Sequence, residues 1–168
     1  MSHPGRASRS RPEYRPRPAR PGDYDAIAAA IDGWWGRPVL AALPRLFLDH
    51  FHRSSLVVEE SAGLVAFLIG ILSPSDPRSA YIHFAGVAPT ARRHGLARML
   101  YAEFFAMARA DGRSIVTAVT APANSGSISF HESLGFAVTG PVPGYNGPGR
   151  DLIVFERPLG HTNAGDFP

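Results

Sequence analysis

Residues 92–98 combine arginine, histidine and glycine in a pattern that suits the binding of an anion. Arg92 and Arg93 stand just before Gly95, and Arg98 follows in a long helical pattern that begins near this glycine. The first N–H groups of a helix lack partners within the helix, and the helix dipole favours negative charge there. Glycine lets the backbone approach a phosphate without a Cβ in the way. We therefore expect a phosphate or pyrophosphate site, with an ordinary strand-to-helix connection as the alternative.

A second segment begins at Asn124 and places polar residues at the start of a short helix. Ser127 can cap this helix, and Gly135 suits its C-terminal turn. Phe130 and Leu134 are four residues apart and would share one apolar face. Caps and core packing explain most of these residues without any ligand.

Both segments need a sheet to position them. Strand patterns occur at residues 17–20, 55–59, 64–72, 80–87, 115–120, 136–139 and 152–156, and helical patterns at 23–32, 39–52, 95–111 and 127–134. Residues 33–38 should break the first helix, and Pro44 should kink or delay the second. Strands that alternate with helices predict an α/β (α+β) protein with a mixed sheet and helices on its faces.

The charge is unevenly distributed along the chain. All 17 basic residues are arginine, and they face 14 acidic residues, for a net charge of +3. Residues 1–20 carry six arginines and one glutamate, so the rest of the chain is slightly acidic. We expect a disordered Arg/Pro-rich tail at 1–16, one folded domain at 17–159 and a flexible C-terminal tail at 160–168. A contact of the N-terminal tail with nucleic acid or another polyanion is the less favoured alternative to a solvated tail.

Composition excludes several kinds of site. The absence of cysteine rules out disulfides, zinc–thiolate sites and a thiol nucleophile. The histidines lack metal-ligand spacing apart from His50 and His52, which would lie on different faces of a helix, so no metal is expected. The longest apolar run, 64–72, is too short to span a membrane, and no apolar segment follows the basic N-terminus. We expect a cytoplasmic protein, and the arginine-only composition with abundant Ala, Gly and Pro suggests a bacterial source.

The two segments together resemble the GNAT superfamily of acetyl-CoA-dependent N-acetyltransferases. The first matches the family signature Arg/Gln-x-x-Gly-x-Gly/Ala at 92–97, preceded by Val-x-Pro at 87–89. The second matches Asn-x-x-Ser-x-x-Phe-Tyr/His-x-x-Leu-Gly-Phe at 124–136. The order of the elements also matches, so the resemblance covers roughly residues 17–159.

The resemblance implies the GNAT fold, a mixed and mostly antiparallel sheet in which strand 80–87 splays away from strand 115–120. Acetyl-CoA would lie in that gap, pair with the first strand and place its pyrophosphate at the helix N-terminus. Gly86 would allow a bulge or a close approach. The implied cofactor-binding residues are Ala85, Gly86, Val87, Arg92, Arg93, His94, Gly95, Leu96, Ala97, Arg98, Asn124, Ser127, Phe130 and His131.

Candidate catalytic residues are His83, Tyr81 and His131. Alternation along the strand puts His83, Tyr81 and Ala85 on one face, with Phe84 opposite and in the core. His83 would serve as the base, unless it only packs beside the sheet. His131 stands where many relatives have tyrosine, so it is either the acid for the departing thiolate or a wall of the cofactor site. The backbone N–H of Ala85 would stabilise the oxyanion.

The acceptor site is the least defined part of the sequence. Candidate substrate-binding residues are Trp34, Trp35, Tyr81, His83 and Tyr145, and the nearest carboxylates for an ammonium are Asp32 and Asp76. Two adjacent tryptophans in a loop should point to opposite sides, either as one core and one exposed residue or as a wall facing the substrate. We expect direct acetyl transfer to a primary amine, of a small molecule rather than of a protein N-terminus or lysine. An acyl-CoA-binding sensor without turnover is the alternative from another class, and relatives often form homodimers.

Overall fold

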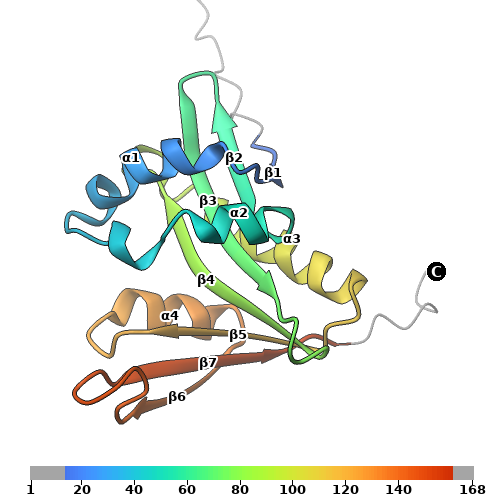
Figure 1. Ribbon diagram of the computed structural model, residues 1–168, viewed down its shortest axis with the longest axis vertical. Coiled ribbons are helices and arrows are strands. Elements are labelled where there is room, and N and C mark those ends of the chain that lie inside the picture. The colour runs from blue at the N-terminus through green and yellow to red at the C-terminus, as the bar shows by residue number, and fades with distance from the viewer. Residues whose placement is uncertain (1–13, 161–168) are drawn as a thin grey trace, which may run out of the picture.

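The computed structural model describes residues 14–160 and contains one seven-stranded sheet (Figure 1). The expectations for residues 1–13 and 161–168 lie outside the described part. The strands run in the order β1-β2-β3-β4-β5-β7-β6, and every neighbouring pair is antiparallel except β4 and β5. Their bounds are Arg17–Pro18 (β1), Leu56–Glu60 (β2), Gly63–Leu72 (β3), Ser79–Val87 (β4), Ile115–Thr120 (β5), Ala137–Val142 (β6) and Leu152–Pro158 (β7).

Helices cover both faces of this sheet (Figure 1). Their bounds are Asp23–Trp35 (α1), Leu46–Phe51 (α2), Leu96–Ala110 (α3) and Ser125–Ser133 (α4), with short 3₁₀ turns at Leu40–Ala42 (η1), His52–Ser54 (η2) and Pro89–Ala91 (η3). Helices α1 and α2 pack with Phe67 and Ile69 of β3 in one cluster. Helices α3 and α4 pack with Leu68 in the other. The alternation of side chains along β3 therefore supplies both cores.

The parallel pair of strands separates halfway along its length. Residues Ser79 to Ile82 of β4 pair with Ile115 to Ala118 of β5, and the remainder of β4 has no strand partner on that side within residues 14–160. The expected splay between these two strands is thus confirmed. Figure 1 shows β4 leaving β5 as it runs toward α1.

The β-bulge in β4 lies at His83 and not at Gly86. Ile69 of β3 pairs with Phe84, whereas the next residue, Gly70, pairs with Ile82, so His83 is the extra residue. Gly86 serves the other expected purpose, a close approach. A Cβ added there would lie 2.6 Å from the ring of Trp35 and 2.8 Å from that of Phe67.

Two expected helices have different bounds. Helix α1 continues through Gly33 and both tryptophans to Trp35 and ends at Gly36, whose φ of 66° is left-handed. The predicted helix at 39–52 is wrong as a single helix, because the chain forms η1, a break that contains Pro44, and then α2. The late start expected from the proline is confirmed at Leu46.

The cap of α4 also differs from the expectation. The side chain of Asn124 accepts a hydrogen bond from the Ser127 N–H at 3.2 Å, so α4 starts at Ser125. Ser127 therefore lies inside the first turn and does not cap the helix. Asparagine is among the best N-cap residues, which explains the earlier start.

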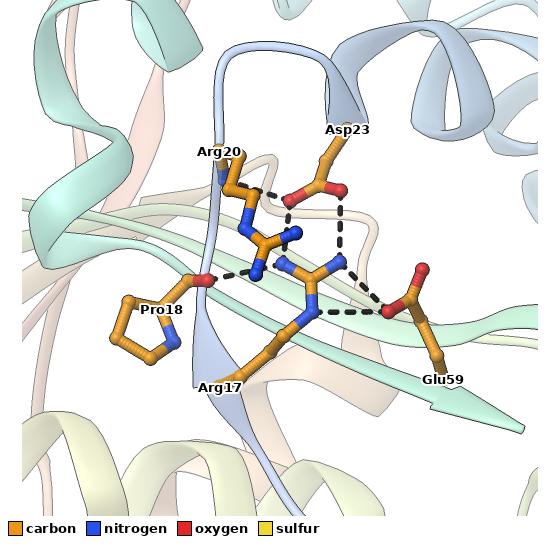
Figure 2. Close-up of polar contacts among 5 residues, drawn as sticks. All are labelled: Arg17, Pro18, Arg20, Asp23 and Glu59. Carbon is orange, nitrogen blue, oxygen red and sulfur yellow. Dashed lines mark hydrogen bonds and ion pairs between the residues drawn. The ribbon is translucent and has the colours of Figure 1, made fainter.

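An arginine holds the first strand to the body of the domain (Figure 2). The Arg17 guanidinium donates to both carboxylate oxygens of Asp23 at 2.9 Å and to Glu59 at 2.7 Å. This pairing lowers the pKa of Asp23, since the guanidinium favours the charged carboxylate. Among residues 14–160, no helix is long and apolar enough to cross a membrane.

Candidate functional site

Three hollows form one track along the free half of β4. The anion hollow, about 360 Å³, lies at the start of α3 and is lined by Val87, Ala91, Arg92, Arg93, Gly95, Leu96, Ala97, Arg98 and Phe130. The tryptophan hollow, about 340 Å³, is lined by Trp34, Trp35, Ala85, Gly86, Val87 and Arg92. The inter-strand hollow, about 180 Å³, lies between β4 and β5 and includes His83, Ala85, Asn124, Ser127 and His131. Shared lining residues make the three hollows continuous.

The backbone of the anion hollow is shaped to present N–H groups. Arg93 has a φ of 69° and Gly95 a φ of 78°. A left-handed conformation costs free energy for arginine and is uncommon outside functional turns. Residues of this kind curl successive N–H groups around an anion. No side chain of the described part of the chain caps α3 at Gly95, so the first N–H groups of the helix remain available.

The arginines around this hollow have different roles. Arg92 donates to the carbonyl of Trp34 at 2.7 Å and so ties the end of α1 to the site. Arg98 donates to the hydroxyl of Ser133 at 2.8 Å and braces α4. Arg93 is exposed at the rim. His94 lies 3.2 Å from the Ala91 carbonyl through Nδ1 and does not line the hollow.

The backbone of β4 offers N–H groups to the inter-strand hollow. The Ala88 N–H donates to Val65 of β3 at 2.8 Å. Because N–H groups alternate between the two edges of a strand, those of Ala85 and Val87 point away from β3. β5 does not pair with this part of β4. An extended ligand can therefore add to β4 as a strand would.

His83 is held in one orientation at the bulge. Its ring stacks on Phe47 of α2 with centroids 4.0 Å apart, and Nε2 lies 2.7 Å from the carbonyl oxygen of Ala42. A carbonyl can only accept, so the proton of the neutral ring is on Nε2 and the lone pair is on Nδ1. Burial lowers the pKa of His83, and the Ala42 hydrogen bond opposes this only in part. The imidazole is thus neutral at pH 7.

The bulge changes the expected order of side chains on β4. His83 and Phe84 contact the cluster beneath α1 and α2, and their rings are 6.0 Å apart. Ala85 packs against the opposite cluster. The expectation that Ala85 shares the His83 face is therefore wrong, as is the expectation that Phe84 points the other way. Tyr81 does share that face, with its ring 6.1 Å from His83.

His131 is buried and has both ring nitrogens engaged. It stacks on Phe155 at 3.9 Å, Nδ1 lies 2.8 Å from the Ser127 carbonyl, and Nε2 lies 3.1 Å from the Tyr101 hydroxyl. Nδ1 therefore carries the proton, and Nε2 accepts from tyrosine. Burial lowers the pKa of His131 and raises that of Tyr101, so both are neutral at pH 7.

The candidate acceptor residues are only partly brought together. Trp34 and Trp35 both line the track from the last turn of α1, and both rings contact Phe67. The predicted loop with tryptophans on opposite sides is therefore wrong. Tyr81 lies within the sheet, where burial and the nearby Tyr145 raise its pKa.

Three other polar residues are placed away from the expected contacts. Tyr145 is half exposed in the β6–β7 loop. The carboxylate of Asp32 accepts from the backbone N–H groups of Val39 and Leu40, and Asp76 accepts from that of Arg78. Neither acid lines the track, so neither is placed to hold an ammonium group.

Tyr101 and Arg37 are among the lining residues that the sequence does not single out. Tyr101 of α3 lines the inter-strand hollow. Its position in a long helical pattern predicts only core packing. Arg37 lies at the same hollow, just after the end of α1. The family resemblance assigns residues 33–37 to the acceptor site as well as to a helix break, but only the two tryptophans of this segment are named as candidate binding residues.

Family comparison agrees with this geometry. The model of the Acetyltransferase (GNAT) family matches residues 24–136, which include β4, the anion hollow and α4. The chain belongs to the GNAT acetyltransferase family. It is an acetyltransferase. A search of curated protein sequences finds no significant match.

Solved structures share the fold at low sequence identity. A GNAT-family protein from Desulfovibrio desulfuricans is 19% identical with a TM-score of 0.74, covering 88% of this chain and 99% of that one. The acetyltransferase yncA from Salmonella typhimurium, solved with acetyl-CoA, is 24% identical with a TM-score of 0.68, covering 94% and 100%. Diaminobutyrate acetyltransferase from Paenibacillus lautus, solved with its substrate and CoA, is 19% identical with a TM-score of 0.69, covering 88% and 95%.

The chemistry of the track fits acetyl-CoA. The start of α3 with Arg93 suits the pyrophosphate, and the free edge of β4 suits the extended pantetheine arm with its amides. Within residues 14–160, no group of three or more His, Asp or Glu side chains could hold a metal ion.

Proposed function

We propose that this acetyltransferase acetylates the primary amine of a small molecule by direct attack in a ternary complex. The observation that carries the proposal is the free Nδ1 of His83, a neutral base beside the free edge of β4. The chain contains no cysteine to carry an acetyl group. This agrees with direct attack by the bound amine, which needs no covalent intermediate on the protein.

The two ends of the track bind different parts of acetyl-CoA in this proposal. The N–H groups from Arg93 to Ala97 hold the pyrophosphate, and those of Ala85 and Val87 align the pantetheine arm. Acetyl-CoA supplies an activated acetyl thioester and a thiolate leaving group. The Ala85 N–H donates to the carbonyl oxygen as negative charge develops on it, where a fixed dipole is more effective than water.

His83 takes the proton that the amine must lose. An alkyl ammonium cannot attack, so a base must remove a proton before or during attack. Nδ1 accepts it while Nε2 keeps its hydrogen bond to Ala42, so the ring does not have to turn. The N–C bond forms as the carbonyl π electrons move onto oxygen, and the carbonyl then re-forms while the C–S bond breaks and its electron pair leaves on sulfur. The nitrogen loses two protons in all, one from the ammonium before attack and one from the adduct, and each passes through His83 to solvent.

The geometry of His131 favours its role as a wall of the site. Its only N–H is donated to the Ser127 carbonyl, and protonation of Nε2 would have to displace the Tyr101 hydroxyl. A thiol with a pKa near 8 gives a thiolate that is a weak enough base to leave without a proton donor. We assign His131 and Tyr101 to holding α4 against α3 beside the pantetheine arm.

Two alternatives remain specific enough to test. Acetylation of a protein N-terminus or a lysine requires a peptide to enter the same track. A sensor would bind acetyl-CoA without turnover. The neutral, fixed His83 favours an enzyme, and one structural relative, the diaminobutyrate acetyltransferase, binds a small amino acid.

A turnover screen tests these alternatives. Acetyl-CoA is incubated with small amines and with peptides that offer either a free N-terminus or an internal lysine, and CoA thiol is followed with a thiol reagent. The protein has no cysteine, so it contributes no background. We expect steady thiol release with small amines. Release with peptides alone would contradict the small-molecule acceptor, and acetyl-CoA binding without release would show a sensor.

A further inference from the structure

We infer that the acceptor of this enzyme carries an anionic group, such as a carboxylate, next to its amine, and that Arg37 binds this group. The inference rests on the proposed amine acetylation and names the acceptor class. It starts from the inter-strand hollow, where the base His83 and Arg37 line the same space. Trp35 contributes an apolar wall beside them.

Among residues 14–160, Arg37 is the only formally charged residue that lines the inter-strand hollow. The two histidines that line the hollow have lowered pKa values and are neutral. The other lining residues are apolar or carry a hydroxyl or amide group. No Asp or Glu lines the hollow among the described residues. A second positive charge on the acceptor would meet no opposite charge here. A negative charge would meet a guanidinium.

The guanidinium of Arg37 is not used by the fold. Within residues 14–160, Arg17, Arg92 and Arg113 donate to carboxylates or backbone carbonyls, whereas Arg37 has no such bond. The nearest carboxylate in sequence, Asp32, accepts from two backbone N–H groups. Arg37 is therefore free to form the paired hydrogen bonds that a guanidinium makes with a carboxylate.

The segment that carries Arg37 is fixed at both ends. On one side, Arg92 binds the carbonyl of Trp34, and Gly36 ends α1 in a left-handed conformation. On the other side, the Asp32 carboxylate holds η1, and the Ala42 carbonyl binds His83 itself. The base and the guanidinium are thus linked through one short segment. This linkage sets a defined spacing between the reacting amine and the anion.

The phosphates of CoA have their own site. They are served by the start of α3 and by Arg93, which line the anion hollow, and Arg37 does not line that hollow. Arg37 lies on the α1 side, after Trp35. The charge at Arg37 is therefore available to the second substrate.

A binding experiment with matched ligands tests this inference. Protein saturated with CoA is titrated by calorimetry with an α-amino acid, its carboxamide and the corresponding decarboxylated amine, and with spermidine. We expect the amino acid to bind about tenfold or more tightly than the other three, as a charge-assisted pair predicts. The Arg37→Gln variant should lose this preference. The matched control Arg53→Gln, which removes an exposed arginine of η2 outside the track, should keep it.

Each outcome decides the inference separately from the proposed function. Equal affinities, or tighter binding of the amine, carboxamide or spermidine, would overturn it. So would an amino-acid preference that survives Arg37→Gln, or a loss of CoA affinity in that variant as large as the loss of acceptor affinity. Thiol release is measured with the same ligands and acetyl-CoA. Its absence with every amine would contradict amine acetylation and leave the binding preference as measured.

Discussion

At the scale of single residues, the proposed catalysis depends on one histidine at one irregularity of a strand. His83 lies on the face of Tyr81, the extra residue in β4 brings Phe84 to the same face, and Phe47 and Ala42 fix the His83 ring under α2. Burial keeps the ring neutral, and the hydrogen bond decides which nitrogen is basic.

Replacing this histidine should remove one limb of the pH profile. In the wild type, kcat/KM should fall as the pH drops below the pKa of His83, which burial holds under its usual 6.5, because the protonated ring cannot act as a base. His83→Gln should lower kcat about 100-fold and abolish that limb. The exposed His50, outside the track, gives the control His50→Gln. An unchanged rate and profile in His83→Gln would disprove the role of base.

At the scale of elements, the site requires α1 to lie directly on β4. Gly86 makes this possible, because any larger residue would meet the rings of Trp35 and Phe67. The contact sets the position of the last turn of α1 and, with it, of the loop that follows. The approach of one helix to one strand therefore places the acceptor side of the track.

Two glycine-to-alanine changes test this contact. Gly86→Ala should destabilise the protein by about 1–3 kcal/mol, as overpacking does, and should raise KM for the acceptor by displacing Trp35. Gly33→Ala is the matched control within α1, where a Cβ meets nothing within 4 Å. Alanine should stabilise that helix by about 0.5–1 kcal/mol. Urea denaturation measures both, and equal effects of the two changes would contradict the packing.

The sequence predicts the regular elements well and their irregularities poorly. Strand 115–120 and the start of α3 follow from apolar patterns and from glycine, which are local signals. The bulge at His83 depends on the register with β3, which no local pattern encodes. Helix α1 passes through Gly33 because its modest cost is outweighed when Trp34 and Trp35 pack on Phe67. The proposed cofactor side rests on local motifs, whereas the proposed acceptor side depends on tertiary contacts, which is why the sequence does not single out Arg37.

At the scale of the whole molecule, the active site and the stability of the fold share two titrating groups. His83 and His131 both have pKa values lowered by burial. In the unfolded chain both would titrate near 6.5. Between those values, the unfolded chain binds more protons than the folded protein does.

Stability should therefore decrease as the pH falls below about 6.5. The free energy of unfolding, measured by urea at pH 7.5 and 5.5, should be lower at pH 5.5, and His131→Gln should reduce the difference. A further loss should follow as Asp23 is protonated below its usual 3.8, because its pairing with Arg17 lowers its pKa. Stability that is flat from pH 7.5 to 5.5 would show that the histidines are not buried as described.

Binding of acetyl-CoA should stabilise the whole domain. A ligand that binds the folded state alone raises the free energy of unfolding by about 2.7 kcal/mol at a concentration 100 times Kd. We expect a concentration-dependent rise in Tm that is smaller at equal concentration for Arg93→Ala, because one cation leaves the anion hollow. A Tm that does not respond to acetyl-CoA would contradict the cofactor track.

The central claim is that the amine attacks acetyl-CoA directly, and a thiol-release time course with and without amine tests it most directly. Direct transfer predicts no thiol release above the uncatalysed rate before an amine is added. After addition, it predicts steady release matched one to one by acetylated amine, with no change in the mass of the protein. A burst of thiol without amine, together with an acetylated protein, would contradict direct transfer.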